Sequence, residues 1–132
     1  MSAIGPSGGL PFGWIGGGSG SGSGSEYLSY VALLSQSGVN NPVATVLENE
    51  LSGVPVWTRS SDGEFFLTLA GAFPANRVVF FVKQGNLIST AGFILWGYRV
   101  DNNNIFLAQW DAGGSYVDVM DQVSFELRVY PA

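Results

Sequence analysis

The sequence predicts an all-β protein: an antiparallel, jelly-roll-like β-sandwich of about eight strands, preceded by an irregular N-terminal peptide and a flexible Gly/Ser linker. Three observations support this fold class. Short segments rich in Val, Phe, Tyr, Trp, Ile and Leu are separated by turn-forming segments such as SSDG, DNNN and DAGG. The segment VSFELRVYP, residues 123–131, alternates apolar and polar side chains with the period of a strand. No segment has the periodicity of an amphipathic helix.

Residues 1–15, MSAIGPSGGLPFGWI, are too rich in glycine and proline to nucleate a helix. Their apolar content nevertheless predicts an anchor peptide that docks on a partner, because disordered segments are usually poor in aromatic residues. A disordered tail or an expression remnant is the alternative. The side chains predicted to anchor are Ile4, Leu10, Phe12, Trp14 and Ile15.

Residues 16–25 contain only glycine and serine and are predicted to be a flexible linker. A coil of this length spans roughly 17 Å, so it would let a tethered peptide search nearby surfaces. The regular tract fits both a natural linker and an engineered one.

Residues 26–132 are predicted to form the single folded domain, because about 107 residues suffice for one modest core. Turn signals divide this part of the chain into short apolar segments. The expected strands cover residues 27–36, 43–49, 55–60, 64–70, 77–83, 92–100, 105–110 and 123–130.

The expected strands differ in how their apolar residues are distributed. Phe65, Leu67 and Leu69 share one face of theirs, whereas VVFFV at 78–82 and FILWGY at 93–98 are apolar throughout. A small sandwich buries one face of each sheet, so a neighbouring subunit is the simplest explanation for burial of the second face of these two strands. Only 11% of residues are charged, against about 25% in ordinary domains, which also favours self-association. The physics alone does not choose between a dimer and a trimer.

Composition excludes several classes of function. The chain has no cysteine and no histidine, which removes thiolate catalysis, disulfides, Ser-His-Asp triads and most zinc sites. Its five basic residues are scattered and its net charge is −5, which argues against nucleic-acid binding. Neither a signal peptide nor a membrane-spanning apolar run is recognisable, so no membrane insertion is expected.

Aromatic residues offer a candidate ligand site, because Trp and Tyr combine an apolar face with a polar edge. The candidates include Trp57, and their rings could stack against a sugar, although core positions are the alternative for most of these residues. The segment WGYRVDNNN, residues 96–104, is the most lectin-like, but DNNN is better explained as a hairpin tip. The predicted ligand-binding residues are Trp96, Tyr98, Arg99, Asn102, Trp110 and Tyr116.

No catalytic, cofactor or metal site is predicted, and no enzyme. Carboxylate pairs exist at Glu48 with Glu50 and at Asp118 with Asp121, but a small sandwich offers little cleft for glycoside hydrolysis. Aspartates in turns lack the twelve-residue calcium-loop pattern, and no GK[ST] follows the glycine-rich tract. The aspartates considered for calcium are Asp101, Asp111, Asp118 and Asp121.

Several segments resemble small β-domains of structural and fibre-type proteins of tailed bacteriophages. These are YVALLSQSG, PVATVLENEL, VWTRSSDGEFFLTLAGAF and the terminal ELRVYP, which together span most of residues 28–131. The resemblance implies a trimeric virion component fastened to another virion protein by an N-terminal peptide. It transfers no catalytic or ligand residue, and residues 1–25 lie outside it.

Three functions follow as hypotheses. The first is a non-enzymatic virion structural protein, a head-fibre, decoration or tail-fibre module whose apolar peptide attaches it to the particle. The second is a carbohydrate- or receptor-binding module, with a host-surface glycan as its ligand. The third is an engineered fusion of a ligand peptide to the domain that binds it.

Overall fold

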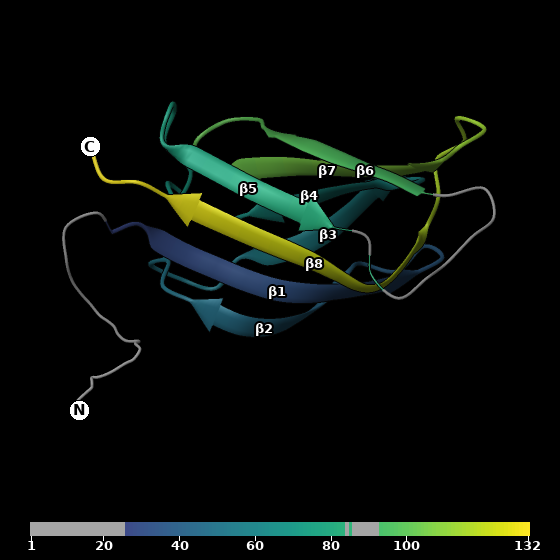
Figure 1. Ribbon diagram of the computed structural model, residues 1–132, viewed down its shortest axis with the longest axis horizontal. Coiled ribbons are helices and arrows are strands. Elements are labelled where there is room, and N and C mark those ends of the chain that lie inside the picture. Colours follow the sequence, from purple (N-terminus) through teal and green to yellow (C-terminus); the bar gives the residue numbers. More distant parts are fainter. Residues whose placement is uncertain (1–25, 84, 86–92) are drawn as a thin grey trace.

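A computed structural model describes residues 26–83, 85 and 93–132. Their eight strands form two four-stranded antiparallel sheets that pack face to face, which confirms the predicted all-β sandwich (Figure 1). The first sheet has the order β2-β1-β8-β5 and the second β3-β4-β7-β6. The strands are β1 (Leu28–Ser37), β2 (Val43–Asn49), β3 (Val56–Ser61), β4 (Glu64–Thr68), β5 (Val78–Lys83), β6 (Phe93–Arg99), β7 (Asn104–Asp111) and β8 (Val119–Val129).

The first and last strands lie side by side in the middle of the first sheet, where Tyr30 of β1 faces Leu127 of β8. Strands adjacent in sequence make three further antiparallel pairs: β1 with β2, β3 with β4, and β6 with β7. In Figure 1 the first sheet lies in front and the fainter second sheet behind it. The strand order therefore places β5 and β6 at edges of different sheets, and each sheet turns its outer face away from the core.

The core lies between the sheets and is built from alternate residues of each strand. On β8, Val123, Phe125, Leu127 and Val129 are buried, which confirms the predicted alternation. The second sheet contributes Trp57, whose indole Nε1 donates a hydrogen bond to the Tyr30 hydroxyl over 3.1 Å. Burial raises the pKa of the Tyr30 phenol. The neutral hydroxyl therefore accepts a hydrogen bond inside the core, which offsets the cost of burying both polar groups.

Strand ends match the prediction within one residue, except at β4 and β8. β4 ends at Thr68 because Gly71, with φ of +69°, belongs to the turn that follows it. β8 begins at Val119, four residues before the predicted start at 123. Gln122 has φ of +57°, and the pairing with β1 shifts register at this point. This bulge breaks the alternation on which the prediction depended.

The hairpin between β3 and β4 is joined to the segment before β8 by a polar network. Arg59 donates from Nε to Asp118 Oδ1 over 3.0 Å and from Nη2 to Oδ2 over 2.8 Å. The Gly63 amide adds a third hydrogen bond to Asp118 Oδ1, over 2.8 Å. Gly63 has φ of +64°, and a Cβ there would lie 2.5 Å from the Gln109 carbonyl oxygen. A glycine is therefore required at this turn, and it lets the carboxylate be held from two sides.

We expect this network to make the fold sensitive to acid. Hydrogen bonds from Arg59 and Gly63 lower the pKa of Asp118, the Arg59 bonds contributing most. A carboxyl with a depressed folded-state pKa stabilises the fold above its unfolded pKa near 3.9, and this stability is lost as pH falls through the folded pKa. Asp118→Asn should therefore destabilise the domain by about 1.5 to 3 kcal/mol at neutral pH and flatten its stability profile below about pH 4.

Urea unfolding of both proteins between neutral pH and about pH 2.5 measures this difference. Asp62→Asn is the matched control, because the Asp62 side chain contacts the same Arg59 but is 81% exposed. That change should cost well under about 1 kcal/mol. Equal acid profiles for the Asp118→Asn protein and the parent would contradict the assignment.

Candidate functional site

The outer face of the second sheet carries a continuous group of aromatic side chains. Cross-strand pairing creates it: Phe66 on β4 faces Phe106 on β7, and Phe106 faces Tyr98 on β6. Two residues earlier on β6, Trp96 faces Ala108, a small residue that leaves room for neighbouring rings. We call this surface the aromatic face; its members are Phe66, Ile94, Trp96, Tyr98, Phe106, Trp110 and Tyr116.

The rings of the aromatic face contact one another in an unbroken chain. Trp96 and Tyr98 stack, with centroids 5.7 Å apart and planes at 22°. Trp96 also lies 5.6 Å from Phe106 and 5.4 Å from Trp110. Trp110, near the end of β7, meets Tyr116 in the segment between β7 and β8 edge to face at 5.7 Å. Such contacts hold the rings in place, so the surface exists before any partner arrives.

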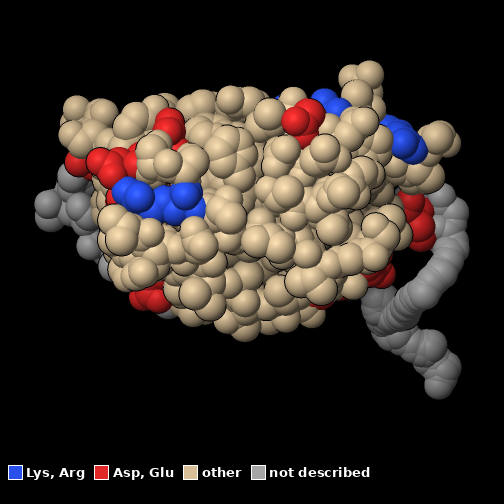
Figure 2. All heavy atoms as spheres, turned by 180° about the vertical axis from the view of Figure 1, so that it is seen from behind, with Lys and Arg blue, Asp and Glu red and all other residues tan. Residues whose placement is uncertain are grey.

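Large parts of this surface are open to solvent in the single chain. Ile94 is 48% exposed, Trp96 37% and Tyr98 49%, whereas Phe106 is covered by its neighbours. Figure 2 shows this side of the molecule with Lys, Arg, Asp and Glu at its margins and an uncharged middle. At the outward positions of the second sheet's strands, β3, β4, β6 and β7, Glu64 on β4 is the one charged residue. Exposed apolar patches of this kind mark interaction sites in soluble proteins.

The outer face of the first sheet differs, because charged side chains are interleaved with its apolar residues. Arg128 on β8 lies 5.0 Å over the Phe81 ring and 4.8 Å over the Tyr27 ring. Its Nε donates to Glu126 over 2.8 Å. The guanidinium thus covers one face of both rings while staying at the surface. The second sheet is therefore the stronger candidate for a binding surface.

The structure gathers four of the predicted ligand-binding residues and separates two. Trp96, Tyr98, Trp110 and Tyr116 all belong to the aromatic face. Arg99 occupies the opposite side of β6, and its Nε donates to the Phe73 carbonyl over 2.7 Å. Its Nη2 donates to Asn102 Oδ1 over 2.6 Å. These two residues thus join the hairpin tip to the loop before β5.

Sequence analysis did not identify Phe66, Phe106 and Ile94 as part of this site. The sequence gives a weak indication for Phe66: it alternates with Phe65 and Leu67 on β4, which are buried, so its side chain points to the outer face. Phe106 sits in a segment that is buried along most of its length, which hides its orientation. Only the order β4-β7-β6 places these residues beside Trp96.

The predicted tip of the β6–β7 hairpin is confirmed at residues 100–103, between the two strands. Asp101 Oδ1 accepts hydrogen bonds from the Asn103 amide over 2.8 Å and from Asn104 Nδ2 over 3.1 Å. The Asn103 amide, as the main cause, lowers the pKa of the Asp101 carboxyl. DNNN is thus a side-chain-stabilised turn, and its carboxylate is engaged within the loop.

The carboxylate pairs noted in the sequence make structural hydrogen bonds. Glu50 Oε1 accepts from the Ser29 amide over 2.9 Å, and Glu48 accepts from the Ser29 hydroxyl. Asp118 is held by Arg59 and Gly63, while Asp121 is exposed on β8. Within residues 26–83, 85 and 93–132, no group of three or more Asp, Glu, His or Cys side chains is placed to hold a metal ion. No helix in this described part is long and apolar enough to span a membrane.

The predicted anchor residues Ile4, Leu10, Phe12, Trp14 and Ile15 lie outside the described residues, as does the linker at 16–25. Comparison with family models, curated proteins and solved structures finds no match for this chain. None of these comparisons links it to bacteriophage structural proteins, so that resemblance stays a prediction. The functional argument therefore depends on the aromatic face and on the physical chemistry of the fold.

Proposed function

We propose that the protein is a non-enzymatic structural module that assembles with copies of itself through the aromatic face. One observation carries the proposal: seven apolar side chains, six of them aromatic, lie together on the outer face of one sheet, and Ile94, Trp96, Tyr98 and Tyr116 among them are exposed. Protein interfaces of this kind have an aromatic centre and a polar rim. Thr58, Glu64, Thr68 and Asn104 surround the patch and would supply that rim.

Energetics favour assembly over isolation. Full burial of a large apolar side chain stabilises a protein by about 1.5 to 3 kcal/mol, so each half-exposed ring would gain about 1 kcal/mol at an interface. Each added copy contributes the same rings, and closed symmetry lets all of them be buried without an open-ended filament. Ile94, Trp96 and Tyr98 alternate along the outward side of β6 and are exposed in the single chain. The sequence predicted that both faces of this strand are buried, and a second copy would cover the outward one.

A virion is the setting that we propose for this assembly. Two sequence features support it: the resemblance of residues 28–131 to bacteriophage fibre-type domains, and the apolar peptide at residues 1–15. In this proposal the peptide attaches the module to another virion protein and the sandwich projects from the particle as a trimer. The number three comes from the resemblance, whereas the aromatic face supports self-association in general.

The mass of the full chain in solution tests this proposal. Light scattering after size exclusion should give about three times the chain mass of 14.0 kDa at micromolar concentration. A dimer would keep the self-association and overturn the trimer, and with it the main support for a fibre module. A stable monomer at these concentrations would overturn assembly through the aromatic face.

A second candidate function, carbohydrate binding, is favoured by the Trp96–Tyr98 stack. The two rings are within 22° of parallel, and Trp96 and Tyr98 are 37% and 49% exposed, so ring surface is open to the apolar face of a sugar. On the neighbouring strands β4 and β7, the Thr68 hydroxyl donates a hydrogen bond to the Asn104 amide oxygen over 2.7 Å, and both oxygens could still accept hydrogen bonds from sugar hydroxyls. A glycan array probed with the parent protein and with Trp96→Ala tests this candidate, because a true platform loses its signal when the indole is removed.

A further inference from the structure

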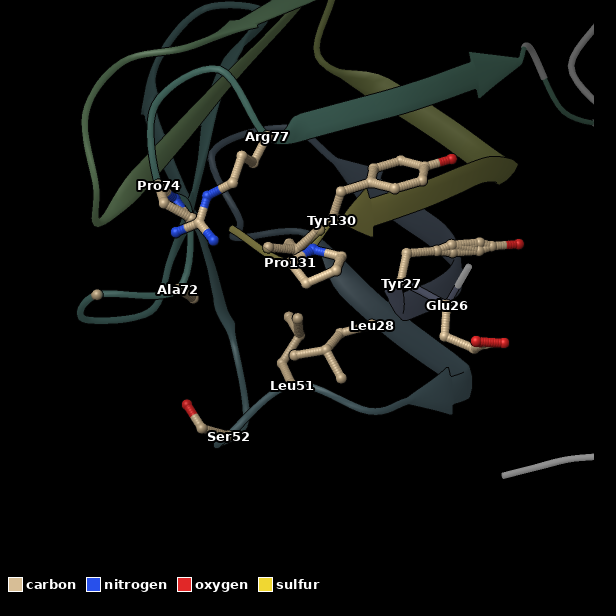
Figure 3. Close-up of a pocket in the computed structure, with 12 residues that line it drawn as sticks. Glu26, Tyr27, Leu28, Leu51, Ser52, Ala72, Pro74, Arg77, Tyr130 and Pro131 are labelled. Atoms are coloured by element: carbon tan, nitrogen blue, oxygen red, sulfur yellow. The ribbon is translucent and has the colours of Figure 1, made fainter. Parts of the chain in front are cut away.

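A pocket of about 480 Å³ lies at the end of the sandwich where the described chain begins and ends (Figure 3). Four separate segments build it: the start of β1, the loop between β2 and β3, the loop between β4 and β5, and the end of β8. Its volume lies in the range of about 300 to 1,000 Å³ that is typical of small-ligand sites. None of the residues of the aromatic face lines it, so the two surfaces are distinct.

Most of the pocket lining is apolar, and its two charged residues are Glu26 and Arg77. Leu28 and Leu51 form one side; Tyr27 and Tyr130 also line the pocket, but their rings, 5.2 Å apart, point away from the two leucines. Leu28 is 48% exposed, so part of its side chain is open to solvent. The pocket therefore has apolar area available for a ligand.

Arg77 supplies the positive charge of the pocket lining. Figure 3 shows its side chain extending along the wall opposite Leu51, toward Pro74. The three ion pairs among the described residues involve Arg59 and Arg128 and not Arg77. Its guanidinium can thus donate to backbone carbonyl groups or lie against an aromatic ring of a ligand. An uncharged apolar peptide with aromatic residues matches these properties better than an ion does.

The chain itself carries such a peptide close by. Glu26, the first described residue, is part of the pocket wall. The ten residues before it, 16–25, are the Gly/Ser linker, and LPFGWI at 10–15 comes directly before that linker. A linker of this length has a span of roughly 17 Å and holds its two ends at an effective concentration of roughly 1 mM.

We propose that residues 10–15 of the same chain dock in this pocket, with Phe12 and Trp14 as the anchoring side chains. At roughly millimolar effective concentration, a peptide with a dissociation constant of about 1 mM is docked in about half of the molecules. At micromolar protein concentration, a chain from outside the assembly cannot compete with that value. The docked peptide shields its own apolar residues, and a partner with higher affinity removes it from the pocket.

Paramagnetic relaxation in the full chain tests the proposal. The sequence has no cysteine, so Ser7→Cys provides a unique position for a nitroxide label three residues before the proposed segment. In the ¹⁵N-labelled protein, the amide signals of Leu51, Ala72 and Arg77 should lose about half of their intensity or more. Signals of the aromatic face, such as that of Trp96, should keep theirs.

Two variants of the spin-labelled chain serve as controls for the docking residues. Phe12→Ser with Trp14→Ser should restore the pocket signals, whereas Ile4→Ser, which removes an apolar residue outside the segment, should not. Ala72→Trp fills the pocket from a loop residue and should also restore the signals of Leu51 and Arg77. Broadening that is spread over the whole surface, or that survives the Phe12 and Trp14 changes, would overturn the proposal.

A mixed sample decides whether the peptide belongs to the same chain. Labelled ¹⁵N protein without nitroxide is combined with an equal amount of unlabelled protein that carries it. Unchanged pocket signals support docking within one chain. Pocket signals reduced by about half as much as in the doubly labelled protein would overturn it in favour of exchange between chains, because half of the peptides in the mixture carry the nitroxide. Docking within one chain adds no contact between chains and leaves the mass measured in solution unchanged, so failure here is separable from failure of assembly through the aromatic face.

Discussion

Replacing Phe125 with alanine is expected to destabilise the domain by about 3 to 5 kcal/mol, the range for large aromatic side chains deleted from protein cores. Phe125 lies on β8, in the middle of the first sheet, and has no exposed surface. Its ring contacts Trp57 at 5.0 Å, Phe80 at 5.8 Å and Tyr30 at 6.2 Å. These partners belong to both sheets, so the cavity would open at the point where the sheets meet.

Such a loss is large compared with the total stability of a domain, about 5 to 15 kcal/mol. Urea unfolding followed by circular dichroism measures it, at one fixed protein concentration because self-association would stabilise the folded chain. Phe81→Ala is the matched control: its ring is 50% exposed on neighbouring β5 and should cost only about 1 kcal/mol. Similar losses in the two variants would mean that Phe125 is not at the centre of the core.

Local patterns were sufficient to predict most strands, because they depend on neighbouring residues in the sequence. The alternation along β8 placed Phe125 and Leu127 in the core correctly, and turn residues placed the hairpin tips. The start of β8 was wrong because Gln122 adopts a positive φ, which inserts a bulge that no composition signal marks. A bulge is a property of two paired strands, and one strand alone does not reveal it.

The candidate sites depend on contacts that are distant in sequence, and these were predicted less completely. Trp96 and Tyr98 were identified as ligand-binding candidates from their residue types. Phe66 and Phe106 were not, because 39 positions separate residues that become neighbours through the order β4-β7-β6. The pocket beside Glu26 has walls from four segments, and none of them carries a recognisable motif. Topology, and not local propensity, assembles both surfaces.

Replacing Trp96 and Tyr98 with lysine is expected to convert the assembled protein into a monomer of 14.0 kDa. At each contact between two copies, four half-exposed rings would lose about 1 kcal/mol of burial each. That loss of about 4 kcal/mol raises the dissociation constant roughly a thousandfold. Four positive charges brought together across a symmetric contact would oppose assembly further, as lysines do on the edge strands of natural sheets.

Val79→Lys with Phe81→Lys is the matched control, because each sheet has an edge strand with two exposed apolar side chains two residues apart. β5 is an edge strand of the first sheet, and these two side chains, 42% and 50% exposed, have the same spacing as Trp96 and Tyr98 on edge strand β6. Both variants should keep the parent's secondary structure, since all four side chains point outward.

Light scattering should then report a monomer for the β6 variant and the parent mass for the β5 variant. The reverse pattern would place the contact on the first sheet, and an unchanged mass in both would exclude the sheet faces from assembly. If the β6 variant instead keeps its mass and loses binding to a glycan, the aromatic face is a sugar platform, because only that function needs the two rings without needing a second copy.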